Sequence, residues 1–163
     1  MTRQVSLLLL VLFSSMMIRQ SHGQTAYPML MSIEPAACQL GSSSEHTLKS
    51  RYSMLGAFEV IVSGTGVRGD VVPVIEDAKA DSKAKTGETL VVRFQVDANA
   101  DPGIRDVRIA TPRGASTVGQ IVLVADPVVY EPKDNDTAAK AQKLDLPITA
   151  CGRIEKAEDV DFF

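Results

Sequence analysis

The stretch TLVVRFQVDA, Thr89 to Ala98, carries a clear strand pattern. Its apolar and polar side chains alternate, as a half-buried strand requires, because successive side chains of a strand point to opposite faces. The stretch therefore predicts a strand with one face in a core. The side chains expected on that face are Leu90, Val92, Phe94 and Val96.

Similar runs, separated by Gly, Pro and Ser, flank this stretch on both sides. The Arg68-Gly69-Asp70 tripeptide is predicted to lie in a tight turn. The charged segment 76–88 lacks an apolar stripe that would hold a helix down, so we expect a solvated hairpin tip. Strands at this spacing predict an all-β, immunoglobulin-like β-sandwich over residues 27–125. The further strands are expected in PMLMSIEP (28–35), GAFEVIVSG (56–64), VVPVI (71–75), IRDVRIATP (104–112) and VGQIVLVAD (118–126), with a weaker, more polar candidate around 46–50.

The N-terminus has the pattern of a signal peptide. A basic lead-in precedes the apolar run VSLLLLVLF (5–13), and Arg19 ends the apolar region before the roughly 20 residues that a membrane span needs. Small residues stand at Ser21 and Gly23, so we expect a signal peptide at 1–23. The protein would then be exported (secreted, periplasmic or at the cell surface), with no membrane span after signal cleavage. The alternative is an uncleaved membrane anchor.

Charge and aromatic content exclude some classes of partner. Loss of residues 1–23 removes Arg3 and Arg19 but no acid, so the formal net charge moves from −3 to −5. A mildly acidic chain without a Lys/Arg cluster is a poor nucleic-acid binder. The chain has no Trp and few other aromatic residues, which argues against a stacking platform for sugars or bases. We therefore expect no nucleic-acid partner.

The composition changes after the predicted sandwich. DPVVYEPKDNDT (126–137) is rich in Pro and acids and predicts an extended linker, with a short helical turn at 138–142. LDLPITACGRIEKAEDVDFF (144–163) predicts two strands and the start of a third at 159–163. These strands are too few to bury a core. We therefore expect an incomplete second β-sandwich module.

Two resemblances follow from these residues. The segment EPKDNDTAAKAQKLDLPITACGRIEKAEDVDFF (131–163) resembles the start of a bacterial pre-peptidase C-terminal (PPC) domain, with its "G-x-I" and "D-x-D-Y/F-F" strands. The resemblance implies a truncated, jelly-roll-like module of the kind appended to secreted bacterial proteases and surface proteins. PMLMSIEP, GAFEVIVSGTGV and PGIRDVRIATPRGAS are similar to the immunoglobulin-like (IPT/TIG-like) region that precedes such domains in large secreted bacterial proteins.

The PPC resemblance also implies a calcium site. Some relatives of the module, the collagen-binding domains of secreted collagenases, bind Ca²⁺ in the acidic opening segment and near the aspartates before the aromatic strand. Ca²⁺ takes six to eight oxygen ligands, and a flexible acidic loop can supply them. Lys133 departs from the pattern, because it stands where a second carboxylate is expected. The alternative is that these are solvated acids that cap a turn and keep strand edges soluble. The matching donors are Glu131, Asn135, Asp136, Asp159 and Asp161.

Residues for catalysis are scarce. His46 follows Glu45 in a polar stretch and is predicted to be a surface histidine. Cys38 lies in an apparent loop, with no helix N-terminus to lower its pKa, so a Cys38–His46 nucleophile and base pair is not favoured. We find no G-x-S-x-G elbow, no set of zinc ligands and no phosphate-binding loop. We expect no enzyme activity and no cofactor other than Ca²⁺.

The pairing of the two cysteines is open at this point. Cys38 and Cys151 belong to different predicted modules. Export makes a disulfide possible, and the loop it would close is long, worth roughly 4–5 kcal/mol in the chain-entropy model. Two unpaired, partly buried thiols are the alternative.

These observations predict a non-catalytic, exported β-sandwich module for adhesion, spacing or substrate targeting, as the N-terminal part of a larger secreted or surface protein. Its partner would be an extracellular protein, a polysaccharide or the remainder of a larger polypeptide. The alternative is the accessory front end of a secreted peptidase or hydrolase whose catalytic domain is absent from this chain. A complete, calcium-dependent binding protein is a third possibility.

Overall fold

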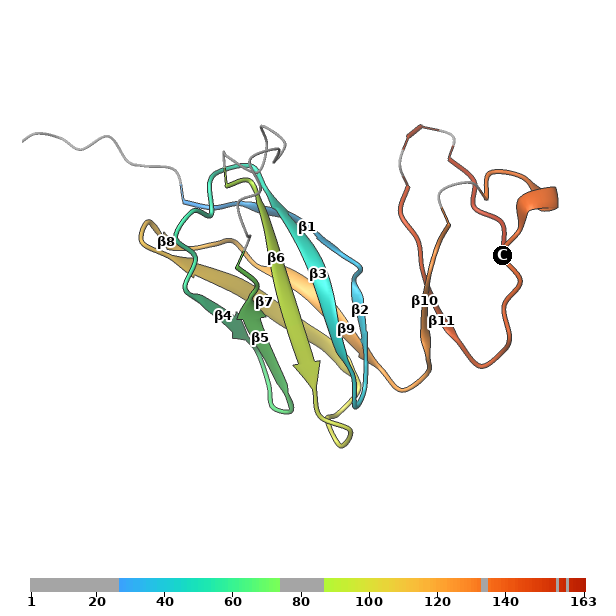
Figure 1. The fold of residues 1–163 in the computed structure, drawn as a ribbon, viewed down its shortest axis with the longest axis horizontal. Helices are drawn as coiled ribbons and strands as arrows, with labels where there is room; N and C mark the ends of the chain where they lie inside the picture. Colours follow the sequence, from blue (N-terminus) through green and yellow to red (C-terminus); the bar gives the residue numbers. More distant parts are fainter. Residues whose placement is uncertain (1–26, 74–86, 133–134, 155, 158) are drawn as a thin grey trace, which may run out of the picture.

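The structure is a computed structural model that describes residues 27–73, 87–132, 135–154, 156–157 and 159–163 (Figure 1). The predicted signal peptide and nearly all of the predicted hairpin tip lie outside the described residues. Within the ranges that are described, no helix is long and apolar enough to cross a membrane.

Most of the described chain is a curled β-sheet that forms a sandwich (Figure 1). Its strand order is β1-β3-β6-β5-β4-β7-β9-β2, and β8 pairs with β7. In an immunoglobulin-like sandwich, A-B-E-D form one sheet and C-F-G the other, and β1-β3-β6-β5 and β4-β7-β9 repeat these two orders. The predicted all-β fold is confirmed. The strands are β1 (Leu30–Glu34), β2 (Ala37–Gln39), β3 (Ser43–Ser50), β4 (Glu59–Val62), β5 (Val67–Val71), β6 (Thr89–Val96), β7 (Gly103–Thr111), β8 (Gly114–Ala115) and β9 (Gly119–Val124).

The core lies between the two layers of the sandwich. As predicted from the alternation, Val92, Phe94 and Val96 of β6 are buried, while Arg93 points to solvent. Apolar side chains from both layers meet in one cluster, so the alternation of each strand is satisfied by the opposite layer. Further members of this cluster are Leu48, Val107, Ile109, Ile121 and Leu123.

The first strand changes layers at a proline. β1 pairs with β3 in one layer, and the chain then passes the cis Glu34-Pro35 bond. β2 continues in the other layer, parallel to β9, with Cys38 opposite Leu123. Cys38 was predicted to lie in a loop, and this is wrong: it lies in a strand and points into the core. Pairing with β9, which is distant in the sequence, creates this strand.

One strand prediction is confirmed and two further predictions are wrong. The weaker candidate around 46–50 is a strand, β3, and it lies centrally, between β1 and β6. The strand expected at 71–75 is not found there: β5 ends at Val71, and 72–73 are not in a strand. Arg68-Gly69-Asp70 lies within β5 and not in a turn. Gly69 pairs with Val60 on one side and with Phe94 on the other. A Cβ atom on Gly69 would lie 2.5 Å from Val60 Cγ1 and 3.0 Å from Phe94 Cε1, so this glycine permits the close packing of three strands.

The rest of the chain forms a second, smaller part beside β2, which we call the tail (residues 126–163) (Figure 1). β10 (Val128–Tyr130) and β11 (Thr149–Cys151) form a parallel pair in which Tyr130 lies opposite Cys151. A single 3₁₀ turn, η1 (Ala138–Lys140), lies between them, where a short helical turn was predicted. Thr137 is its N-cap residue but makes no capping hydrogen bond with its side chain.

The predicted organisation of the tail needs two corrections. Residues 126–137 were predicted to be an extended linker, but 128–130 form β10, because β11 supplies hydrogen-bond partners. Residues 159–163 were predicted to begin a strand, and in the structure they form none. Phe162 joins them to 135 and 142 by two backbone hydrogen bonds, and the Asp159 N–H donates to the Lys156 carbonyl over 3.3 Å. A jelly-roll-like architecture stays a prediction.

Candidate metal centre

The tail folds back on itself, which brings its two acidic segments together. The Glu131 N–H donates to the Cys151 carbonyl over 3.0 Å at the end of the parallel pair. Beyond it, the Phe162 N–H donates to the Asn135 carbonyl over 3.1 Å, and the Gln142 N–H donates to the Phe162 carbonyl over 3.1 Å. The segment after β10 and the last residues of the chain are therefore neighbours.

Three carboxylates converge where these segments meet. Asp136, Asp159 and Asp161 each place one oxygen so that all three lie within 4.8 Å of one another. The Asp159 side chain is only 4% exposed. Partial desolvation, followed by the nearby charges of Glu131, Asp159 and Asp136, raises the pKa of Asp161. We call this group, with Glu131 and Asn135, the acidic cluster.

Asn135 contributes a buried amide to the acidic cluster. The residue is 1% exposed, and one end of its amide lies 3.1 Å from the Pro132 carbonyl oxygen and 3.3 Å from Asp161 Oδ1. The nitrogen occupies that end, where it donates to both oxygens. The amide therefore ties Pro132 to Asp161.

A lysine already sits at the edge of the acidic cluster. Lys156 Nζ lies 3.0 Å from Asp136 Oδ2 and 3.9 Å from Asp159 Oδ1. Its side chain is 64% exposed, so these are ion pairs of a lysine that is largely in solvent. Lys133, the departure from the PPC pattern, lies outside the described residues. Lys156 was missed, although its spacing of three from Asp159 was a visible signal.

The donor set fits Ca²⁺. Of the five predicted ligands, Asp136, Asp159 and Asp161 bring carboxylate oxygens within 4.8 Å of one another. Asn135 and Glu131 lie beside Asp161, and the Pro132 carbonyl, which accepts from the Asn135 amide, is a backbone oxygen that side-chain reasoning could not reveal. The donors are hard oxygens, several of them charged, as Ca²⁺ prefers. The chemistry available at this site is therefore cation binding.

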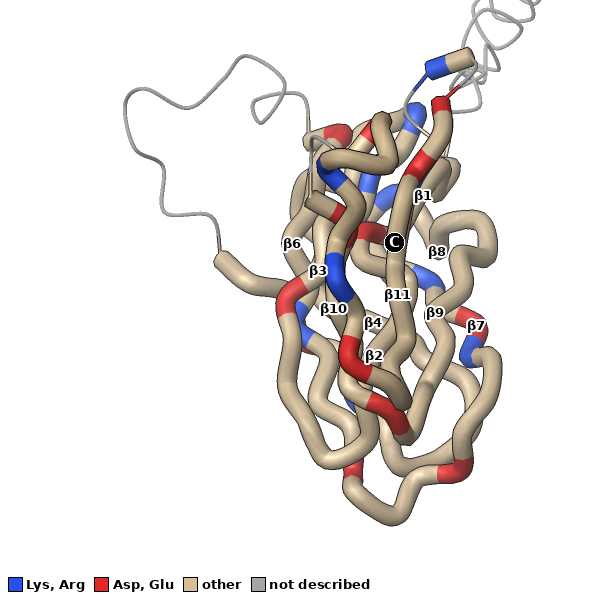
Figure 2. The backbone as a smooth tube through the Cα atoms, turned by 90° about the vertical axis from the view of Figure 1, so that its right-hand side faces the viewer, with Lys and Arg blue, Asp and Glu red and all other residues tan. Residues whose placement is uncertain are grey.

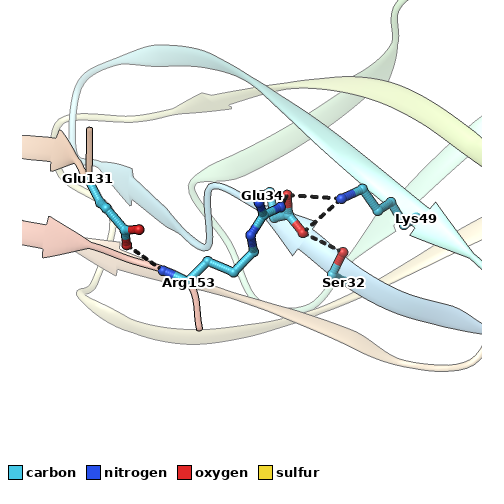
Figure 3. A network of polar contacts seen from close by, with 5 residues as sticks. All are labelled: Ser32, Glu34, Lys49, Glu131 and Arg153. Carbon is cyan, nitrogen blue, oxygen red and sulfur yellow. Dashed lines mark hydrogen bonds and ion pairs between the residues drawn. The ribbon is translucent and has the colours of Figure 1, made fainter. Parts of the chain in front are cut away.

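A network of polar contacts links the acidic cluster to the sandwich (Figure 3). Glu131 Oε2 accepts the backbone N–H of Arg153 over 2.7 Å. The Arg153 side chain reaches Glu34 at the end of β1, with Nη1 2.9 Å from Oε2. Glu34 also accepts hydrogen bonds from Ser32 and Lys49. We call these five residues the junction network. The ion pair between Arg153 and Glu34 joins residues 119 positions apart, so no pattern in the sequence indicated it.

A groove of about 650 Å³ runs beside the junction network, between β1 and the tail. Ile33 and Pro35 line it from the sandwich, and Tyr130 and Cys151 line it from the tail. Seen from this side, Lys and Arg positions (blue) and Asp and Glu positions (red) are interspersed along the backbone (Figure 2).

His46 and Cys38 form a buried pair inside the sandwich. The prediction of a surface histidine is wrong, because His46 is fully buried. Its Nδ1 lies 2.6 Å from the Pro35 carbonyl, which can only accept, so Nδ1 carries the proton. Nε2 then accepts from Ser44 Oγ at 2.8 Å and faces Cys38 Sγ at 3.4 Å. The edge of the imidazole also meets the Phe94 ring.

This environment keeps both groups neutral. Burial lowers the pKa of His46, against the opposing hydrogen bond to Pro35. Burial raises the pKa of the Cys38 thiol to about 11. A nucleophilic thiol needs the reverse shift and access to solvent, so the pair is suited to packing and not to catalysis. Both cysteines are free thiols in the structure, with Cys38 buried and Cys151 half-buried.

Comparisons with known proteins identify no family for this chain. No protein-family model matches the chain, and no curated protein sequence matches it significantly. One solved structure to which this chain is similar is the sialic-acid-binding region of the Streptococcus sanguinis SK1 adhesin bound to 3'sLn. The match has 12% identity and a TM-score of 0.38, and it covers 71% of this chain. This chain spans about a third (36%) of the length of that one.

Proposed function

We propose that this chain is an exported, non-catalytic β-sandwich module for adhesion, spacing or substrate targeting, and that its tail binds Ca²⁺. The convergence of Glu131, Asn135, Asp136, Asp159 and Asp161 carries the calcium part of this proposal. These residues come from segments more than 20 positions apart, so local chain geometry does not explain their meeting. The buried, neutral Cys38–His46 pair supports a non-catalytic role.

Each group would have a defined part in holding the cation. Bound Ca²⁺ would supply two positive charges among carboxylates that otherwise repel one another. Asp136, Asp159 and Asp161 would provide charged oxygens, and Asn135 would turn its amide oxygen inward. Lys156 would leave its position beside Asp136 and point into solvent. Asp159 is already almost out of water, so part of the desolvation cost is met by the fold itself.

The resemblances support the wider setting of the proposal. An IPT/TIG-like sandwich followed by the start of a PPC module would belong to a larger secreted or surface protein. Its partner would be an extracellular protein or polysaccharide, or the remainder of that polypeptide. An antibody against residues 27–125 would test this, because the exported species that it detects should be much larger than this chain. A species of this chain's size would contradict the larger protein.

Calcium titration by isothermal calorimetry tests the metal site. We expect a dissociation constant of about 10⁻⁴–10⁻³ M, the range of extracellular modules. The Asp159→Asn/Asp161→Asn variant should lose binding, whereas Asp97→Asn, a single exposed acid in the turn after β6, should bind like the wild type. Thermal unfolding of the tail should shift upward with Ca²⁺ through ligand linkage. Absence of both heat and shift would refute the calcium site.

A further inference from the structure

The acidic cluster and the sandwich are connected through Glu131 and Arg153, and we propose that cation binding at the cluster fastens the tail onto the sandwich. The proposal rests on the proposed calcium function and adds a consequence to it. It assigns Arg153 the role of a latch between the two parts. The role is conformational, since its side chain contacts Glu34 of the sandwich.

Arg153 is held at two points that belong to different parts of the molecule. Its backbone N–H donates to Glu131 Oε2 over 2.7 Å, on the side of the acidic cluster. Its guanidinium lies 2.9 Å from Glu34 Oε2, on the side of the sandwich (Figure 3). Any change that fixes or displaces the Glu131 carboxylate therefore acts on the backbone that positions the guanidinium.

Contacts within the sandwich hold Glu34 in position to accept the Arg153 guanidinium. Ser32 Oγ donates to Glu34 Oε1 over 2.9 Å, and Lys49 Nζ lies 3.3 Å from both carboxylate oxygens. Burial opposes the charged form, but these hydrogen bonds and the charges of Lys49 and Arg153 outweigh it, and the pKa of Glu34 is lowered. Ser32 of β1 and Lys49 of β3 therefore orient the Glu34 carboxylate independently of Arg153.

The cation would stabilise the contact of Arg153 on the side of the tail, which is the hydrogen bond from its backbone N–H to Glu131. Glu131 lies close enough to Asp161 for its charge to contribute to the raised pKa of Asp161, so without a cation two ionised carboxylates there would repel one another and favour movement of Glu131 away from the cluster. With the cation bound, Glu131 gains a fixed partner and keeps its hydrogen bond to the Arg153 N–H. Gly152 allows this close approach, because a Cβ at that position would collide with Glu131 Oε2.

The groove gives the latch a functional consequence. Its walls come from both parts of the molecule, with Pro35 on one side and Tyr130 on the other. Firm docking of the tail would hold the groove at one width, and loose docking would let it vary. Ca²⁺ would therefore control the shape of the groove as well as the order of the tail.

Calcium affinity tests the latch, because coupling between sites is reciprocal: if the cation strengthens docking, docking must strengthen cation binding. Arg153→Ala should therefore weaken Ca²⁺ binding about two- to five-fold, the range that an exposed ion pair can supply. Simple charge counting predicts the opposite, because the variant removes a positive charge near the site. Arg68→Ala, which removes the same charge from β5, should bind like the wild type.

Glu34→Gln completes a thermodynamic cycle. It should weaken calcium binding alone, but it should have no further effect in the Arg153→Ala background. Equal or tighter binding by Arg153→Ala would overturn the latch, and so would additive effects of the two substitutions. If the wild type binds no Ca²⁺ at all, the proposed calcium function itself fails.

NMR residual dipolar couplings give a readout that is independent of affinity. In saturating CaCl₂, amides of β7 and β9 and amides of β10 and β11 should fit one alignment tensor. Without Ca²⁺, or in Arg153→Ala with saturating Ca²⁺, the tail couplings should shrink relative to those of the sandwich. Calcium binding that leaves these couplings unchanged would refute the latch and leave the calcium site standing.

Discussion

The sandwich and the tail are held together by different forces. Within the described residues, every buried apolar side chain belongs to the sandwich, and the buried residue of the tail is a polar one, Asn135. Leu146 and Ile154 of the tail are 82% and 72% exposed. Apolar burial stabilises the sandwich at roughly 25 cal/mol per Å². The tail has little such burial, so its order depends on backbone pairing, the junction network and the proposed cation.

The difference has a general lesson. A part that buries an apolar core is insensitive to ions, whereas a part ordered by converging charges responds to whatever neutralises them. In this chain the sandwich would then stay folded whatever ions are present, whereas the order of the tail would depend on the proposed cation. The following changes test this contrast, from the largest expected effect to the smallest.

Phe94→Ala should cost the sandwich about 3–5 kcal/mol of unfolding free energy, because it empties a fully buried site where β3, β5 and β6 meet. Val160→Ala, in the tail, should cost less than about 0.5 kcal/mol, since the side chain is exposed. Urea denaturation followed by circular dichroism measures both. Similar costs would show that the tail has a core of its own, against the contrast drawn above.

Gly69→Ala should destabilise the sandwich by about 1–3 kcal/mol through overpacking, because the new Cβ would meet Val60 and Phe94 at 2.5 and 3.0 Å. Adding Val60→Ala should recover part of that loss, since it removes the nearer of the two contacts. The same denaturation experiment gives the coupling between the substitutions. Strictly additive losses would mean that steric crowding is not the cause.

Gly152→Ala is the matching change in the tail, and its effect should be on calcium and not on the sandwich. Its Cβ would displace the Glu131 carboxylate, so we expect roughly tenfold weaker Ca²⁺ binding, as for other changes that disturb a metal ligand. The unfolding of the sandwich should stay within about 0.5 kcal/mol of the wild type. Gly114→Ala is the control for calcium affinity: its Cβ meets nothing within 4 Å, and the strain of its positive φ of 118° falls on the sandwich and not on the tail.

Acid should weaken the sandwich through His46. Its pKa is lowered by burial, so between the ordinary value of 6.5 and the folded value the unfolded chain binds the extra proton. Stability should therefore fall as the pH drops below 6.5, by at most about 1.4 kcal/mol per pH unit. His46→Gln should make the unfolding free energy less dependent on pH between pH 5 and 6.5, a range above the ordinary pKa values of carboxylates. An unchanged slope would assign the effect to another group.

The strands with strict alternation could be predicted clearly, whereas β3 was only a weaker candidate and the middle of β5 was expected to be a turn. The pattern of β6 alone indicated which side chains are buried, because a period of two has one physical interpretation. β3 and β5 contain polar residues and a glycine, and they become central strands only because β6 lies between them. His46 is buried for the same reason: β3 places its imidazole against the Pro35 carbonyl, Cys38 and Phe94, which its own polar stretch does not indicate.

The acidic cluster was anticipated only through the PPC resemblance. Acidic residues on a polar segment have no preferred meeting point until the chain direction is known, and here the parallel pairing of β10 and β11 sets it. The Pro132 carbonyl and Lys156 were missed, since a backbone oxygen has no sequence signature and a lysine near acids is ordinary. Whether the cluster holds Ca²⁺ is the proposal that the titration tests.

The amino-acid sequence by itself determined the all-β class and the buried face of the most regular strand, because alternation is a local property of the chain. The tertiary structure alone decided the order of the strands, the burial of His46 and the meeting of Glu34 with Arg153. These depend on contacts between distant residues, and such contacts form only when the layers close. In this protein, local alternation determines that the sandwich is built from strands. Contacts between distant residues determine the junction of Glu34 with Arg153, through which the proposed cation would act.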